Sequence, residues 1–577
     1  MRKLSFYPRL AVRSLRLNGK FYLPFLLSGV VSAAMLYDIL FLNMNTGIAR
    51  LKGANAVQGL LGFGAIIVAL FSFALICYTN GFLMKRRQKE LGLYNILGME
   101  KRHLGRLLFW ETVYAAVLCI VGGLGLGILL SKLFLLLLCA VMRVDVAFGF
   151  EVPSEAVLYT CLGFGAIFLL NYLLNLLRLG RVRPIELLHG TESGEREPKT
   201  KWLLALLGVV TMGAGYYLSF TARDPVNALF LFFLAVLLVI IGTYCLFAAG
   251  SIALLKALRK NRRYYYQTRH FTAVSGMLHR MKRNAAGLAT ICILSTMVLV
   301  TVSTTLCLYV GVNEILNRMY SRDVQTYVVY SQPEDLPKIK AVYEEKAAQY
   351  GVEMEDFAAL CFRAPDTDFI NMRTDIDPYL EKADGTDVVG DPADGPMRVY
   401  VGCNLPADTD AGLFAAAVEV AVGTGDLGLS SRWVFTDDSR SGREDFWASL
   451  GGFFFIGLFL GSLFLMAAVL IVYYKQVSEG YEDARSFVIM QQVGMTQKEV
   501  KSSIESQISL VFFLPLLAAA CHTAGAFPMT KTILLLFGLS NTGLFGLCSL
   551  VTLLVFAVVY YLIYRLTARE YYRLVRR

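Results

Sequence analysis

The sequence contains little charge, little histidine and little tryptophan. Of its 577 residues 17% are charged and 56% are hydrophobic, with five His and four Trp. The His and 11 Cys have no spacing typical of a metal site, and no Ser-His-Asp or paired-carboxylate pattern suggests catalysis. A G-x-x-x-x-G-K-[ST] phosphate loop is also missing. We therefore expect no catalytic, metal-binding or cofactor-binding residues, and any ATP hydrolysis must come from another polypeptide.

Long apolar runs, in contrast, are plentiful. About 20 consecutive apolar residues span a bilayer, and ten such runs lie near residues 21–44, 57–84, 107–142, 155–179, 202–220, 226–256, 287–312, 448–475, 507–528 and 542–566. The first run follows a basic stretch and has full membrane length, so we expect an uncleaved span and not a signal peptide. The sequence predicts an all-α, multi-pass plasma-membrane protein.

The distribution of Lys and Arg predicts the orientation. With ten spans and both termini inside, the inner segments hold 37 of the 55 basic residues. Positively charged loops stay on the cytoplasmic side. The count therefore places both termini in the cytoplasm, and membrane orientation explains the net charge of +11 without a nucleic-acid partner.

One long segment has the opposite charge. Residues 313–447 contain 26 acidic and 12 basic residues, a net charge of −14. Strand-like stretches start at Val324, Met397 and Arg432, and a helix from Glu334 is expected to end at Gly351. We predict an extracytoplasmic α/β domain inserted between spans seven and eight. Cys361 and Cys403 within it form either one bridge or two buried thiols.

Two weak internal matches predict a repeat. Residues 90–104 align with 486–500 at an offset of 396. Residues 10–20 resemble 275–285, and matching Asn18 to Asn284 gives an offset of 266. The offsets differ by 130, close to the 135 residues of the acidic segment. Corresponding helices are six spans apart, so the two copies point the same way across the membrane.

This gives a predicted domain organisation. It consists of a cytoplasmic amphipathic helix (1–20), a first repeat with spans one to four (21–200), a hairpin of spans five and six (201–260), an amphipathic helix with span seven (261–312), the extracellular domain (313–447) and spans eight to ten (448–577).

One cytoplasmic loop crowded with charge is "KRRQKELGLYNILGMEKRHLGR", residues 85–106. Its apolar residues recur at helical spacing from Leu91 to Leu108, which predicts an amphipathic helix at the inner membrane face. For Lys85, Arg86, Arg87 and Lys89 a basic interfacial anchor explains the charge. Gly92 and Gly98 would let another protein approach the backbone closely, which favours a docking surface.

This loop carries a family resemblance. "YTNGFLMKRRQKELGLYNILGMEK" (78–101) and "YYKQVSEGYEDARSFVIMQQVGMTQKE" (473–499) resemble segments of FtsX-like ABC transporter permeases, specifically the BceB type of bacitracin and antimicrobial-peptide resistance systems. The resemblance implies two parallel FtsX-like repeats, the first block spanning about 57–185. The residues that match the family motif are Tyr473, Tyr474, Lys475, Gln476, Gly480, Tyr481, Glu482 and Asp483.

The resemblance also implies partners. Two copies of a cytoplasmic ABC ATPase, which would bind ATP-Mg, are expected to dock on both loops, through Glu90, Leu91, Gly92, Leu93, Leu97, Gly98, Met99, Phe487, Met490, Val493, Gly494 and Met495. A membrane histidine kinase, membrane lipids and a peptide antibiotic or its lipid-linked target are further expected partners. The acidic segment suits a cationic peptide, although solubility explains its charge equally well.

Other functions and sites remain open at this stage. A lipoprotein-releasing or cell-division permease of the same superfamily is one alternative, and a secondary transporter is another. Asp38 and Lys132 lie near outer span ends, where snorkelling to the interface is expected. We expect His522 to bond a neighbouring helix rather than relay protons, and Asn171 and Asn175 to bond across helices.

Overall fold

The computed structural model describes residues 6–48, 54–144, 151–181, 202–260, 268–363, 379, 388–389, 396–423, 427–429, 433–492 and 496–575. Helices dominate these stretches, and ten of them are long and apolar enough to cross a membrane. This agrees with the predicted all-α membrane fold and its ten spans. The third and eighth spans begin earlier than predicted, at Lys101 and Ser439, and the ninth extends to Phe537.

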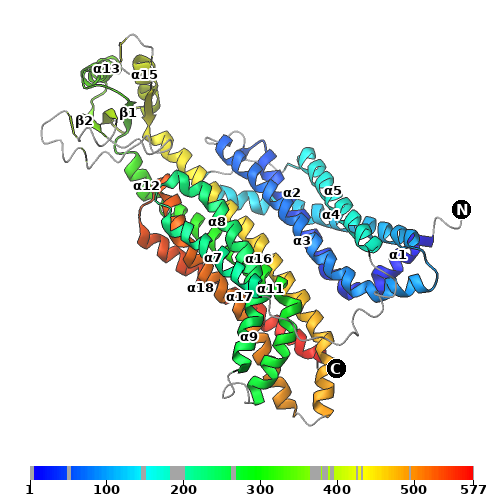
Figure 1. Ribbon diagram of the computed structural model, residues 1–577. Helices are drawn as coiled ribbons and strands as arrows, with labels where there is room; N and C mark the ends of the chain where they lie inside the picture. The colour runs from blue at the N-terminus through cyan, green and yellow to red at the C-terminus, as the bar shows by residue number, and fades with distance from the viewer. Residues whose placement is uncertain are drawn as a thin grey trace.

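The first group of helices surrounds α2. It comprises α1 (Phe6–Leu17), α2 (Gly19–Met44), α3 (Ala54–Ile96), α4 (Lys101–Met142) and α5 (Ser154–Arg181). α2 packs on α3, α4 and α5 (Figure 1). Small residues allow α2 and α4 to approach closely, since a Cβ atom at Gly127 would lie 2.6 Å from the Tyr37 ring.

The second group surrounds α11. Its members are α7 (Trp202–Thr221), α8 (Pro225–Cys245), the π-helix η2 (Leu246–Gly250), α9 (Ser251–Lys260), α11 (Thr268–Val310), α16 (Ser439–Gln492), α17 (Gln497–Leu534), η4 (Leu535–Phe537) and α18 (Thr542–Val575). α11 packs on α16, α17 and α18, while the hairpin of α7 and α8 contacts α17.

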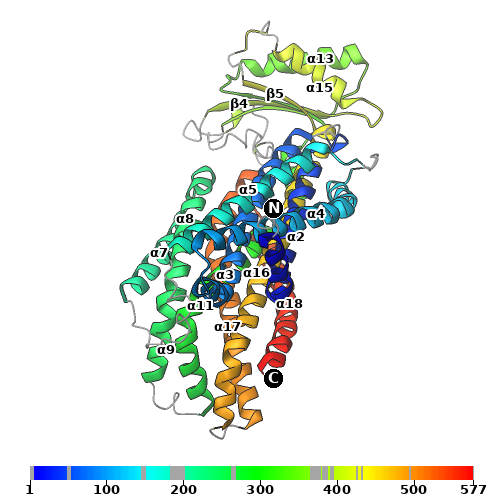
Figure 2. The ribbon, with the colours of Figure 1, turned by 90° about the vertical axis from the view of Figure 1, so that its right-hand side faces the viewer.

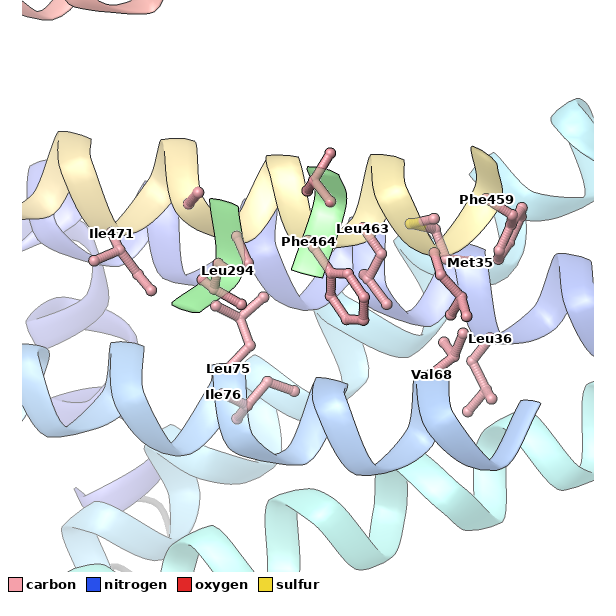
Figure 3. Packing of buried hydrophobic residues seen from close by; sticks show 14 of the residues in the cluster. Met35, Leu36, Val68, Leu75, Ile76, Leu294, Phe459, Leu463, Phe464 and Ile471 are labelled. Carbon is pink, nitrogen blue, oxygen red and sulfur yellow. The ribbon is translucent and has the colours of Figure 1, made fainter. Parts of the chain in front are cut away.

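Helix α16 joins the two groups. It contacts α2, α3 and α4 as well as α11. Figure 3 shows Leu463 and Phe464 of α16 among apolar side chains of α2, α3 and α11. The rings of Phe71 on α3 and Phe464 lie 4.9 Å apart. The largest apolar cluster therefore runs across the boundary between the groups and does not belong to one of them.

A small α/β unit is inserted between α11 and α16. It contains α12 (Val312–Met319), β1 (Val324–Val329), α13 (Asp335–Tyr350), β2 (Glu355–Arg363), β3 (Val388–Val389), β4 (Met397–Asn404), α15 (Ala411–Gly423) and β5 (Trp433–Asp438). The sheet order is β3-β2-β4-β1-β5, with only β2 and β3 parallel. α13 and α15 cover the sheet face that points away from the membrane-spanning helices (Figure 2).

The strands predicted at Val324, Met397 and Arg432 are β1, β4 and β5, and the predicted helix is α13, ending at Gly351. β2, β3 and α15 were not predicted. Both cysteines of this unit are buried in its core. The strand register separates them, because Cys361 lies opposite Val399, four residues from Cys403.

Candidate functional site

The turn between α3 and α4 begins with a glycine C-cap at the end of α3. The Gly98 amide donates to the Asn95 carbonyl (3.1 Å) and the Met99 amide to the Tyr94 carbonyl (3.0 Å), which is the Schellman pattern. Gly98 has a φ of +96°, a conformation that residues with a Cβ atom rarely adopt. The glycine is therefore required by the turn itself.

Residues 91–108 do not form a separate amphipathic helix, so that prediction was wrong. Residues 85–96 continue α3 without a break, and α4 begins at Lys101. The apolar residues that suggested the helix divide into two sets. Leu104, Leu107 and Leu108 are buried, whereas Leu93, Ile96 and Leu97 are 51%, 55% and 72% exposed. The helical spacing is real, but it belongs to two antiparallel helices.

The exposed leucines rest on a packed base. Leu91 is buried together with Leu104, Leu108 and Leu179, and Met99 and Tyr94 pack against this cluster. Gly92 is buried as well. Of the seven predicted docking residues in this loop, Leu93 and Leu97 therefore face outward with the exposed Gly98, while Leu91 and Met99 hold the turn from behind.

A buried ionic network lies behind the turn. Arg87 is only 2% exposed, and its guanidinium forms a bidentate pair with Glu111, with Nη2 to Oε1 at 2.9 Å. The same group donates to the Tyr22 hydroxyl (2.6 Å), the Ser14 hydroxyl (2.8 Å) and Glu90 (3.1 Å). Burial lowers the pKa of a guanidinium, but Tyr22 and Glu111 together raise the pKa of Arg87 above its ordinary value, so the group stays charged.

The interpretation of Arg87 as part of a basic interfacial anchor was therefore wrong. Glu90, a predicted docking residue, also accepts bonds from Asn18 (3.1 Å) and Tyr94 (3.3 Å) and serves this network. One feature of the sequence indicates this buried network. Glu111 is an acidic residue inside an apolar run, and such residues mark functional or paired sites.

The second predicted docking loop, from Phe487 to Met495, is described only in part. Val493, Gly494 and Met495 lie outside the described residues, and the side chains of Phe487 and Met490 are likewise not described. The ends of the flanking helices are described. α16 ends at Gln492 and α17 begins at Gln497, each 396 positions after Ile96 and Lys101.

The first part of the family motif lies between the two helix groups. Tyr474, Lys475, Gln476 and Gly480 are buried, and Tyr473 is half-buried. The Tyr474 ring lies 4.9 Å from that of Phe82 on α3. The side chains of Tyr481, Glu482 and Asp483 are outside the described part of the structure. The motif thus contributes to the contact between α16 and α3.

Of three further polar residues in or near the spans, two lie as predicted and one does not. His522 bonds Tyr216 (2.6 Å) and Thr243 (3.1 Å), so α17 holds the α7–α8 hairpin through this residue, as expected. Lys132 is exposed. Asp38, however, is fully buried and does not snorkel to the interface. Position along a helix sets the depth of a side chain, but packing decides the direction in which it points.

Of the two span-four asparagines, Asn175 is bonded across helices as predicted, to Asn80 (2.7 Å). Asn171 is buried beside them. These side chains, with Arg87 and Glu111, line a cavity of about 20 Å³, enough for one water molecule. No group of three or more metal-ligand side chains gathers in the described residues.

Comparison with known proteins agrees with this architecture. The family model "FtsX-like permease C-terminal" matches residues 62–184, which include the α3–α4 turn. The uncharacterised ABC transporter permease YvcS of Bacillus subtilis is 23% identical over 95% of this chain and 96% of its own length.

Two further relatives are bacitracin export permeases. The BceB protein of Bacillus subtilis is 29% identical over 48% of this chain and 44% of its own length. The BceB protein of Halalkalibacterium halodurans is 23% identical over 89% and 92%. With ten membrane-spanning helices and the family match across the turn, the chain contains an FtsX-like permease segment and is similar over most of its length to ABC transporter permeases, among them permeases of the BceB type.

Proposed function

We propose that the chain couples ATP hydrolysis by a separate ATPase to movement of the sheet domain, residues 313–447, and thereby confers resistance to cationic, cell-wall-directed antimicrobial peptides. The observation that carries the proposal is the α3–α4 turn, where Leu93, Ile96 and Leu97 are exposed on a rigid, packed base. Exposed apolar residues with a rigid backing are typical of protein-binding hot spots.

A second docking turn is part of the proposal. The two helix groups share an arrangement, with α2 packed on α3 to α5 and α11 packed on α16 to α18. The helix ends on either side of each turn differ by 396 positions, the offset found in the sequence. This supports two parallel repeats, each offering one turn to one of two ATPase subunits, with both termini and both turns in the cytoplasm.

The path to the sheet domain runs through α16. This helix begins directly after strand β5, crosses between the two helix groups and ends at the second turn (Figure 1). Arg440, in its first turn, bonds Asp323 (3.1 Å) and the carbonyl groups of Leu405 and Thr409. Movement of α16 would therefore carry the sheet domain with it.

The net charge of −14 in residues 313–447 supports a cationic peptide as ligand, since opposite charge accelerates encounter. The names of two relatives as bacitracin export permeases agree with this. Signalling to a membrane histidine kinase is a further part of the proposal, taken from the family resemblance alone.

Replacement of an exposed leucine tests the docking step. Leu97→Asp should reduce co-purification of the cognate ATPase by about tenfold or more, because a charge would be buried at the interface. The matched control is Leu413→Asp, since Leu413 is also an exposed leucine (59%) but lies on α15 of the sheet domain. Equal ATPase recovery from both variants would contradict docking at this turn.

The resistance step needs its own measurement. Cells that lack the chain should become more susceptible to bacitracin-like peptides, and expression of the natural chain should restore resistance whereas Leu97→Asp should not. Unchanged susceptibility to every peptide tested would remove the defence role and leave the docking proposal standing.

A further inference from the structure

The Arg87 guanidinium is saturated with hydrogen bonds. An arginine has five N–H donors, and here Nε faces Glu90, Nη1 faces Tyr22 and Glu111, and Nη2 faces Ser14 and Glu111. Every donor has an acceptor. A lysine could not reproduce this planar fork. A site so completely satisfied fixes its partners in one arrangement.

The acceptors come from four different elements. Ser14 belongs to α1, Tyr22 to α2, Glu90 to α3 itself and Glu111 to α4. α1 is tied to the same region a second time, because Tyr7 bonds His103 of α4 (2.6 Å), and the Asn18 amide between α1 and α2 bonds Glu90. Arg87 thus joins the N-terminal helix, the first span and both sides of the α3–α4 hairpin.

Arg87 and Glu111 lie at similar distances from the turn of the hairpin. Arg87 precedes the end of α3 by nine residues, and Glu111 follows the start of α4 by ten. At 1.5 Å per residue both lie about 14 Å behind the turn. A displacement applied at Leu97 would therefore reach α1 and α2 through this cross-link before the hairpin could flex internally.

The positions that correspond to this cross-link in the second repeat hold other residues. At the offset of 396, Arg87 aligns with Asp483, Glu90 with Ser486 and Glu111 with Gln507. An acid and an amide cannot form the buried ion pair, so the cross-link of the first hairpin is not repeated at the offset of 396.

We propose that Arg87 and Glu111 are positioning residues that make the first hairpin a rigid lever, with α1 as part of it, so that force at the turn is transmitted to α2. This deepens the proposed function and rests on it for the source of the force. The ion pair does not contact the ATPase, because its members are buried. Its loss should uncouple movement from docking and leave docking itself intact.

The first arm of the test uses the full-length permease alone. Hydrogen exchange in α1 (Phe6–Leu17) should become at least about tenfold faster in Glu111→Gln, because the helix loses its tie to the hairpin. Exchange in α18 should not change. Tyr22→Phe removes one hydroxyl and keeps the ion pair, so it should disturb folding less. It should produce a smaller increase of the exchange rate in α1. Unchanged exchange in α1 for both variants would overturn the proposal.

The second arm uses the complex with the cognate ATPase. Spin labels at Leu413 on α15 and Leu129 on α4, both exposed, report the ATP-dependent distance between the sheet domain and the first helix group. Arg87→Lys and Glu111→Gln should retain the ATPase at wild-type level and lose most of the distance change. The exposed Glu345 on α13, which pairs with Lys346 (3.5 Å), provides the control, and Glu345→Gln should behave as wild type.

The outcomes separate the two proposals. If the variants lose ATPase binding in proportion to their loss of stability, Arg87 and Glu111 have a structural role only, and the positioning role is overturned. The positioning role is also overturned if the variants keep the full ATP-dependent distance change. If Leu97→Asp leaves docking intact, the proposed function fails, whereas the exchange arm still decides whether Arg87 ties α1 to the hairpin.

Discussion

Asp38 is a buried acid without a visible partner. It is fully buried on α2, and neither carboxylate oxygen has a hydrogen-bond partner among the described residues. An unpartnered polar group away from water destabilises the folded state. Leucine has the same branching without the polarity, so Asp38→Leu should raise the free energy of unfolding by about 1–3 kcal/mol. Thermal unfolding of the purified chain measures this.

Asn80 provides the matched control for Asp38. It is equally buried but bonded to Asn175, so Asn80→Leu should lower stability by about 1–3 kcal/mol because Asn175 loses its partner. A destabilised Asp38→Leu variant would show that an ordered water or a functional partner satisfies the carboxylate.

Individual side chains were the least predictable part of the sequence. Four basic residues in "KRRQK" look alike, and only the packing of α1, α2 and α4 around one of them selects Arg87 for burial. Glu111 was the available signal, since an acid in an apolar run requires a partner. The bonds of His522 and Asn175 were predictable because a polar group in lipid must find a neighbouring helix.

At the scale of elements, the end of α3 depends on Gly98. An alanine there would have to adopt a φ near +96°, so Gly98→Ala should lower the free energy of unfolding by about 1 kcal/mol. Gly125 lies inside α4, and a Cβ atom added there would meet no other atom within 4 Å. Gly125→Ala should therefore raise stability by about 0.5–1 kcal/mol. Chemical or thermal unfolding of the two variants checks the opposite signs.

Two equal and negative effects would contradict a conformational requirement that is specific to Gly98. The positive φ at Gly98 also explains why a bulky substitution there is a poor test of docking. It would disturb the turn itself, whereas Leu97 can be changed on an intact turn.

Whole elements were more predictable than their contacts. Apolar runs of membrane length identified the ten spans, and alternation of β-branched and aromatic residues identified β1, β4 and β5. β2 has the sequence "EDFAALCFR" with little alternation, and α15 is short and Ala-rich, so neither pattern was distinctive. The path of α16 between the groups could not be predicted, because contacts between spans are not encoded in hydropathy.

For the molecule as a whole, the proposed mechanism requires the α3–α4 turn and the sheet domain to lie on opposite sides of the membrane. Basic residues around the turn and the acidic sheet domain predict this arrangement. A cysteine introduced at Leu413 should react with a membrane-impermeant maleimide in intact cells. A cysteine at Leu97 should react only after permeabilisation, because both positions are well exposed and differ in side alone.

The native thiols of the sheet domain should not interfere with this measurement. Cys403 is buried, and burial raises its pKa to about 12, so the reactive thiolate is scarce below pH 9. The unsubstituted chain gives the remaining background. Labelling at Leu97 in intact cells, or protection at Leu413, would place the α3–α4 turn outside the cell or the sheet domain inside it. ATP hydrolysed in the cytoplasm could then not act at the turn, and the coupling scheme would fail at its first step.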